Sequence, residues 1–131
     1  MRAVDINVLV RAFVQDDPAQ AARAQALLRA HQVYVPVTVM LELEWVLRSR
    51  YGFTKPVIAA ALERIASLDN AVIGEREAVL AATANVGRGW DFADALHHAL
   101  SVGCDGFATF DAALIKRAGR APVAEPPVVT V

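Results

Sequence analysis

The chain has 131 residues, of which 56% are hydrophobic and 21% are charged. This length predicts one domain over residues 1–131 with a core of its own, and it excludes a two-domain enzyme. At this size packing alone can stabilise the fold, without disulfides or a structural metal. Thirteen Lys and Arg against fourteen Asp and Glu give a net charge of −1. That balance excludes a strongly basic nucleic-acid-binding tail but not a local basic patch.

The sequence predicts neither a membrane span nor a secretory signal. No apolar run approaches the ~18 residues that a spanning helix needs. Asp5 follows the first four residues, which leaves no basic start with an apolar stretch behind it. The expected location is therefore the cytoplasm. The single cysteine, Cys104, has no partner for a disulfide or a zinc site, and we expect it to be buried and inert.

Short β-branched segments alternate with helical patterns along the chain. Asp17 and Pro18 supply an N-cap and a first-turn proline for the second helix, and Thr38 is the expected cap of the third. The predicted strands cover residues 2–6, 33–35, 71–73, 106–109 and 128–131. The predicted helices cover residues 7–13, 18–30, 39–50, 55–68, 75–86, 91–103 and 111–117. The proline-containing residues 121–127 are expected to be extended.

This alternation predicts an α/β fold in three layers, α/β/α, around a short, mostly parallel sheet of four or five strands. In such folds, functional sites collect outside the carboxyl ends of the strands. That edge of the sheet is therefore where chemistry is expected.

Five acidic residues fall near that edge: Asp5, Glu42, Asp91, Asp94 and Asp111. Carboxylates placed close together repel, and a divalent cation removes the conflict. Because no cysteine and no clear histidine pair accompanies them, the expected ion is Mg²⁺ or Mn²⁺. Such an ion can bind a phosphodiester oxygen and lower the pKa of an attacking water, so the pattern is typical of a hydrolase acting on phosphodiesters.

The other use of Asp is to cap helices and shape turns. This interpretation is preferred for Asp16, Asp17, Asp69 and Asp105. It fits Asp5 poorly, because a carboxylate in the middle of the predicted first strand would be half-buried without a partner.

Four segments carry a resemblance to a known family. They are residues 4–10 (VDINVLV), 38–47 (TVMLELEWVL), 91–96 (DFADAL) and 109–111 (TFD). In this order and spacing they resemble the PIN domain, and nearly the whole chain resembles the small toxin nucleases of VapBC toxin–antitoxin pairs.

The resemblance implies a magnesium-dependent endoribonuclease toxin of the VapC type. It assigns the catalytic carboxylates to Asp5, Glu42, Asp94 and Asp111, with Asp5 and Asp94 as the metal ligands. Glu42 would complete the site or orient water, and Asp111 would hold a water or a second ion. Asn7 is a supporting group. The implied partners are a structured RNA such as tRNA or rRNA, a VapB-type antitoxin and a second copy of the chain.

One position departs from the family pattern. Ile6 stands where the family more often has Thr or Ser, so a hydroxyl that could hydrogen-bond a neighbouring carboxylate or water is missing. We expect a somewhat altered site that still binds metal.

Several assignments stay open at the level of sequence. Glu42 and Glu44 flank the same apolar stripe, so periodicity does not choose between them, whereas the resemblance favours Glu42. Asp91 either supports the site or caps the helix that it opens. His98 shares a helical face with the acids, and a structural, hydrogen-bonded role is the commoner one for such a histidine. Arg11 is the first choice for contacting RNA phosphates.

Two other functional classes compete with a toxin nuclease. One is a PIN-like RNA-binding or RNA-processing module without a toxin role. The other is a metal-dependent phosphatase with an aspartate nucleophile, such as Asp5. Phosphatases of that type usually carry a second Asp two residues later, where this chain has Asn7.

Overall fold

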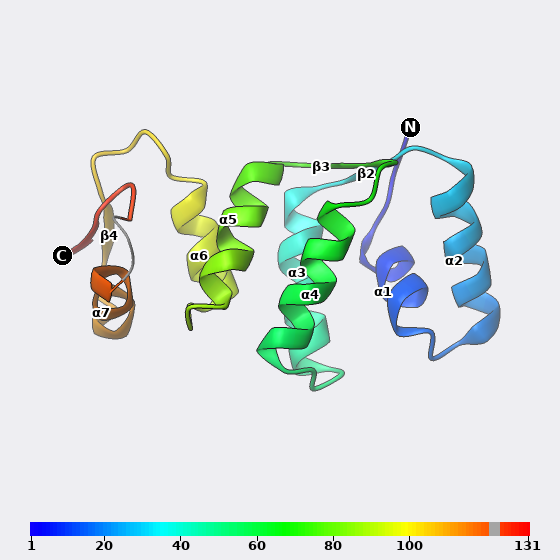
Figure 1. The fold of residues 1–131 in the computed structure, drawn as a ribbon, viewed down its shortest axis with the longest axis horizontal. Helices are drawn as coiled ribbons and strands as arrows, with labels where there is room; N and C mark the ends of the chain where they lie inside the picture. The colour runs from blue at the N-terminus through cyan, green and yellow to red at the C-terminus, as the bar shows by residue number, and fades with distance from the viewer. Residues whose placement is uncertain (121–123) are drawn as a thin grey trace. The chain divides into compact units, whose positions relative to one another are not determined.

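The computed structural model describes residues 1–120 and 124–131. The chain divides into two compact units, Met1–Arg76 and Glu77–Val131 (Figure 1). Among the described residues, no helix has the length and apolar character needed to cross a membrane.

The first unit contains a three-stranded parallel sheet in the order β1-β2-β3. Its strands are β1 (Arg2–Ala3), β2 (Val33–Val35) and β3 (Ala71–Ile73). In the central strand, Val33 and Val35 are almost completely buried. Continuous apolar strands of this kind are typical of parallel sheets covered by helices.

Four helices complete the first unit. They are α1 (Ile6–Val14), α2 (Pro18–Ala30), α3 (Val37–Ser49) and α4 (Lys55–Ala66). Helix α1 lies beside α2, and α3 lies beside α4 (Figure 1). The Asp17 side chain accepts a hydrogen bond from the Gln20 amide, and Pro18 occupies the first turn, as predicted. Large aliphatic side chains form the core, including Leu9, Met40, Leu43 and Leu62.

The second unit combines three helices with a two-stranded parallel sheet. The helices are α5 (Arg76–Val86), α6 (Phe92–Ala99) and α7 (Ala112–Arg120), and α5 begins at the boundary residue Arg76. The strands are β4 (Phe107–Thr109) and β5 (Val128–Thr130). Trp90, Phe92 and Leu96 are almost completely buried.

The α/β class is confirmed, and all strand pairs are parallel. Within the described part of the chain, however, the five strands form two small sheets where one sheet of four or five strands is predicted. The predicted extended segment lies partly outside the described residues, because residues 121–123 are not among them.

Some local predictions are wrong. Strand β1 ends at Ala3, so Asp5 follows the strand directly before α1. Thr38 is not the cap of α3, because that helix begins at Val37 after Pro36 and has no side-chain cap. Cys104 is exposed, since it lies in the turns that follow α6 and not within a packed helix.

Candidate functional site

Asp5 is the N-cap of α1 and is exposed. Its Oδ1 accepts hydrogen bonds from the backbone amides of Asn7, at 3.1 Å, and Val8, at 3.3 Å. Free amides and the helix dipole at this terminus stabilise a negative charge. The prediction of a half-buried, unpartnered strand residue is therefore wrong, because the strand ends before Asp5. The capping bonds use Oδ1 and hold the carboxylate in one orientation.

The two glutamates of α3 have different surroundings. The side chain of Glu44 is buried, and its Oε1 accepts a hydrogen bond from Nε of Arg48 at 2.9 Å. Glu42 is exposed. Burial with an ion-pair partner gives Glu44 a structural function, whereas the Glu42 carboxylate is accessible to a ligand in solution.

In the second unit, two aspartates are held at helix N-termini. Asp91 is the N-cap of α6, and its Oδ2 accepts a hydrogen bond from the Asp94 amide at 3.1 Å. Asp111 directly precedes α7, and its Oδ1 accepts from the amides of Ala113, at 2.9 Å, and Leu114, at 3.2 Å. Both carboxylates are thereby oriented by backbone donors, as Asp5 is in the first unit.

Asp94 lies in the first turn of α6 and is the most perturbed of these acids. Partial burial raises its pKa, and the negative charges of Asp91 and Asp111 raise it further. His97 and Arg117 offset this effect only in part. A bound cation would remove the repulsion among the three carboxylates.

Carboxylate oxygens are the donors that a hard divalent cation such as Mg²⁺ or Mn²⁺ prefers, so the side chain of Asp94 suits such an ion. The negative charges of Asp91 and Asp111 act on the same carboxylate. The described residues of each unit, taken by themselves, contain no group of three or more His, Cys, Asp or Glu side chains arranged as a metal site.

Arg11, the predicted phosphate-binding residue, lies near the end of α1. Its Nη1 donates to Oδ1 of Asp16 at 2.8 Å, and this contact raises the pKa of Arg11. The hydroxyl of Tyr51 donates to Oδ2 of Asp16 at 3.2 Å. Desolvation alone would raise the pKa of Asp16, but the hydrogen bonds and the positive charge lower it. An exposed ion pair of this type is weak, so Arg11 can exchange Asp16 for another anion.

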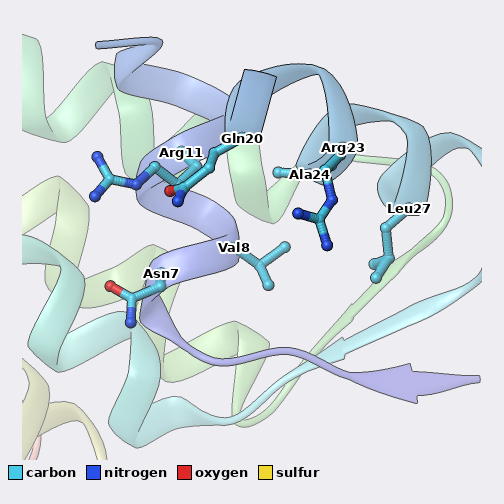
Figure 2. Close-up of a pocket in the computed structure, with 7 residues that line it drawn as sticks. All are labelled: Asn7, Val8, Arg11, Gln20, Arg23, Ala24 and Leu27. Atoms are coloured by element: carbon cyan, nitrogen blue, oxygen red, sulfur yellow. The ribbon is translucent and has the colours of Figure 1, made fainter. Parts of the chain in front are cut away.

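A groove between α1 and α2 opens beside Asn7 (Figure 2). It is lined by Asn7, Val8, Arg11, Gln20, Arg23, Ala24 and Leu27. Sequence reasoning identified Asn7 and Arg11 but missed the contribution of α2. The available signal was the spacing of Gln20, Arg23, Ala24 and Leu27, which places them on one face of a helix without acidic residues.

His98 has a structural position, in agreement with the preferred interpretation. It is buried, and its Nε2 donates to the carbonyl oxygen of Pro126 at 2.7 Å. Its ring packs against Trp90 and Phe107, with centroid distances of 5.4 and 5.7 Å. His98 is therefore buried, although the sequence places it on the same helical face as Asp91 and Asp94.

The fold and the acidic residues define a parallel α/β protein with carboxylates suited to a divalent cation. The model of the PIN domain family matches residues 3–120, so the match runs through both units. The chain belongs to the PIN domain family, within the PIN-domain nuclease superfamily. PIN domains are typically metal-dependent nucleases, which supports a hydrolase function. No curated protein and no solved structure was found to match the sequence.

Proposed function

We propose that this protein is a Mg²⁺- or Mn²⁺-dependent endoribonuclease of the VapC type. It cleaves a structured RNA, such as tRNA or rRNA, at few sites, and a VapB-type antitoxin neutralises it in the cytoplasm. Membership of the PIN domain family supports the nuclease part of this proposal. Each unit exposes large apolar side chains, such as Trp45 in the first and Phe110 in the second, and a homodimer that covers some of them is part of the proposal.

The observation that carries the proposal is the match of the PIN domain family model to residues 3–120, and the charges of Asp91 and Asp111 beside Asp94 support a role for a cation. Burial and two neighbouring carboxylates raise the pKa of Asp94, so its ionised form is less favourable than that of an isolated Asp. A carboxylate kept in such a position is typical of functional sites, where the balancing charge comes from a ligand. An antitoxin Arg or Lys placed against the same carboxylates would supply that charge as well, which gives a physical route to inhibition.

In the proposed site, Asp5 and Asp94 are the metal ligands. A bound divalent ion would activate the phosphodiester as a Lewis acid and lower the pKa of the attacking water. Glu42 completes the ligand set or accepts a hydrogen bond from that water, and Asp111 holds a further water or a second ion. Arg11 contacts a phosphate of the substrate.

Two residues support these groups. The backbone amide of Asn7 donates to Oδ1 of Asp5, so residue 7 fixes the orientation of a proposed ligand through its main chain. Asp91 accepts from the amide of Asp94 and adds negative charge beside that carboxylate. Ile6 provides no hydroxyl between Asp5 and Asn7, which leaves the backbone amides of α1 as the hydrogen-bond donors to Asp5.

The test separates capping from catalysis by substituting Asp with Asn. Asn caps a helix about as well as Asp does, so Asp5→Asn and Asp111→Asn keep the helix N-termini while they remove the charge. Asp17→Asn is the matched control, because Asp17 also caps a helix but has no proposed catalytic role. Each purified protein, free of antitoxin, is incubated with total RNA in Mg²⁺, Mn²⁺ or EDTA, and new 5′ ends are mapped by sequencing.

We expect discrete, metal-dependent ends with the wild type and with Asp17→Asn. Asp5→Asn should reduce the cleavage rate by more than about 100-fold. Mutation of residues that only hydrogen-bond a metal ligand typically lowers activity by about 10- to 100-fold, so loss of a ligand should cost more. Cleavage by folded Asp5→Asn at the wild-type rate would remove Asp5 from the site. Absence of cleavage by a folded wild type that binds Mn²⁺ would favour a non-catalytic RNA-binding module.

A further inference from the structure

The groove between α1 and α2 has the size and lining of a binding site. Its volume is about 420 Å³, within the range of roughly 300–1,000 Å³ that is usual for small-molecule sites. In Figure 2, Val8 extends from α1, while the side chains of Gln20, Arg23 and Leu27 extend from α2. The groove therefore combines apolar side chains with polar and cationic ones.

The charge of the groove is positive although the whole chain carries −1. Two arginines line it, Arg11 and Arg23, and none of the lining residues is acidic. Asp16 compensates the charge of Arg11. For Arg23, the described part of the chain provides no ion pair, and the side chain is exposed. An exposed guanidinium at the edge of a groove is suited to a phosphate, which it can bind through two N–H donors.

The position of the groove relates it to the proposed catalytic residues. Asn7 lines the groove, and its backbone amide donates to Oδ1 of Asp5 at 3.1 Å. A ligand lying in the groove therefore ends beside the N-terminus of α1, where Asp5 is fixed. Arg23 lines the same groove as Asn7, so a flexible polyanion that lies in the groove beside Asp5 would also meet the Arg23 guanidinium.

We propose that the α1–α2 groove binds one unpaired nucleotide of the RNA strand next to the phosphate that is cleaved; this inference rests on the proposed function. Arg23 binds the phosphate of that nucleotide, and the base or ribose packs on Val8 and Leu27. Unpaired nucleotides are the usual targets of specific RNA recognition, because their bases are free to contact a protein surface. Gln20 and Asn7 offer amide donors and acceptors to the base edge.

Charge complementarity favours RNA over a docked helix of another protein. An amphipathic helix needs an apolar strip that accommodates anchors at i, i+3, i+4 and i+7. The apolar part of this groove is formed by only three side chains, Val8, Ala24 and Leu27, and both of its charged residues are cations.

The experiment measures binding without catalysis. Fluorescence anisotropy follows a labelled, unstructured 12-nucleotide RNA added to the full-length protein in EDTA, at several salt concentrations. The variants are Arg23→Gln and a matched control, Arg29→Gln, on the same helix but outside the groove. Both side chains are exposed, so neither change should affect folding.

We expect Arg23→Gln to weaken binding on the order of fivefold. The slope of the logarithm of the binding constant against the logarithm of the salt concentration should become shallower by about 0.7, the value for one lost phosphate contact to a single strand. Arg29→Gln should stay within about twofold of the wild type, because it lies outside the groove. Gln20→Glu, which places a negative charge at the edge with little change in shape, should weaken binding as well. A 12-base-pair RNA duplex should compete less well than the single strand.

Three results would overturn the proposal. These are equal affinities for Arg23→Gln and Arg29→Gln, no binding of the oligonucleotide by folded wild type, and competition by a polyglutamate peptide as strong as by RNA. The last result would assign the groove to an acidic protein partner. Binding that depends on Arg23 without any cleavage in Mg²⁺ would contradict the proposed function alone. If the wild type cleaves RNA but Arg23 does not contribute to binding, the proposed role of the groove is wrong and the proposed function stands.

Discussion

The two units use acidic residues in different electrostatic settings. In the first unit, Asp5 is fixed by two backbone amides, and Arg11 and Arg23 line the groove beside it. In the second unit, Asp94 shares its surroundings with Asp91 and Asp111, and its pKa is raised by burial and by these charges. The first unit therefore combines a carboxylate held by backbone amides with two arginines that line the adjacent groove. The second unit instead places negative charges around Asp94, and a bound cation would balance them.

This difference shows that a residue type does not define a role. Asp5 and Asp111 cap helices with one carboxylate oxygen, and so does Asp17, for which no catalytic role is proposed. Capping and metal binding are compatible, because a carboxylate has two oxygens and several lone pairs. The environment of each acid, and not its presence in a pattern, is what the variants below test.

The largest effect on stability is expected at the core of the second unit. Trp90 is 1% exposed and packs against the His98 ring, whereas Trp45 in the first unit is 50% exposed. Trp90→Ala should lower the free energy of unfolding by about 3–5 kcal/mol, the usual cost of removing a buried aromatic side chain. Trp45→Ala should change it by less than about 0.5 kcal/mol. Urea denaturation followed by circular dichroism measures both, and equal losses would contradict the assigned burial.

The glutamates of α3 should separate activity from stability within the first unit. Glu42→Gln should reduce RNA cleavage by more than about 100-fold and leave stability unchanged, because Glu42 is exposed and its proposed role is catalytic. Glu44→Gln should leave cleavage nearly unchanged but lower the free energy of unfolding by about 1–2 kcal/mol, since it weakens a charge-assisted hydrogen bond to Arg48. The reverse outcome, with activity lost only in Glu44→Gln, would exchange the two assignments.

A smaller effect is expected from Asp94 in the absence of metal. Because its pKa is raised in the folded state, the folded protein binds this proton more tightly than the unfolded chain does. The free energy of unfolding therefore falls as the pH rises from 3.8, the ordinary pKa of Asp, through the higher pKa of Asp94 in the folded protein. Above that higher pKa the loss of stability is complete. In EDTA at neutral pH, Asp94→Asn should slightly raise the Tm, while it abolishes metal-dependent cleavage.

The measurement is thermal unfolding at several pH values with and without Mg²⁺. Asp105→Asn is the matched control, because Asp105 is exposed and has no proposed catalytic role. A lower Tm for Asp94→Asn in EDTA, relative to the wild type, would show that the negative charge of Asp94 stabilises the metal-free protein.

The sequence alone predicted most of the helices and strands, and local signals in the chain explain why. Asp17 followed by Pro18 determines the start of α2, because an acidic N-cap and a first-turn proline both favour that point. The apolar segments Val33–Val35 and Ala71–Ile73 are too short for helices and appear as the predicted strands. The end of the first strand could not be predicted in this way, since residues 4–6 are apolar apart from Asp5 and suit either a strand or a helix start.

The candidate acids were visible in the sequence, but their surroundings were not. Glu42 and Glu44 are equivalent by periodicity, and only packing shows that Glu44 is buried with Arg48 as its partner. The second wall of the groove was missed because it depends on the packing of α2 against α1, which local pattern does not specify.

The sequence by itself determined the α/β class and the family resemblance, and it supplied the candidate acidic residues, because hydrophobic periodicity and residue order are local properties of the chain. Tertiary structure alone decided that Asp5 is an exposed cap, that His98 is buried under Trp90, and that Asp94 has a raised pKa. Burial and electrostatic neighbours arise from residues distant in sequence, so they exist only once the chain has packed.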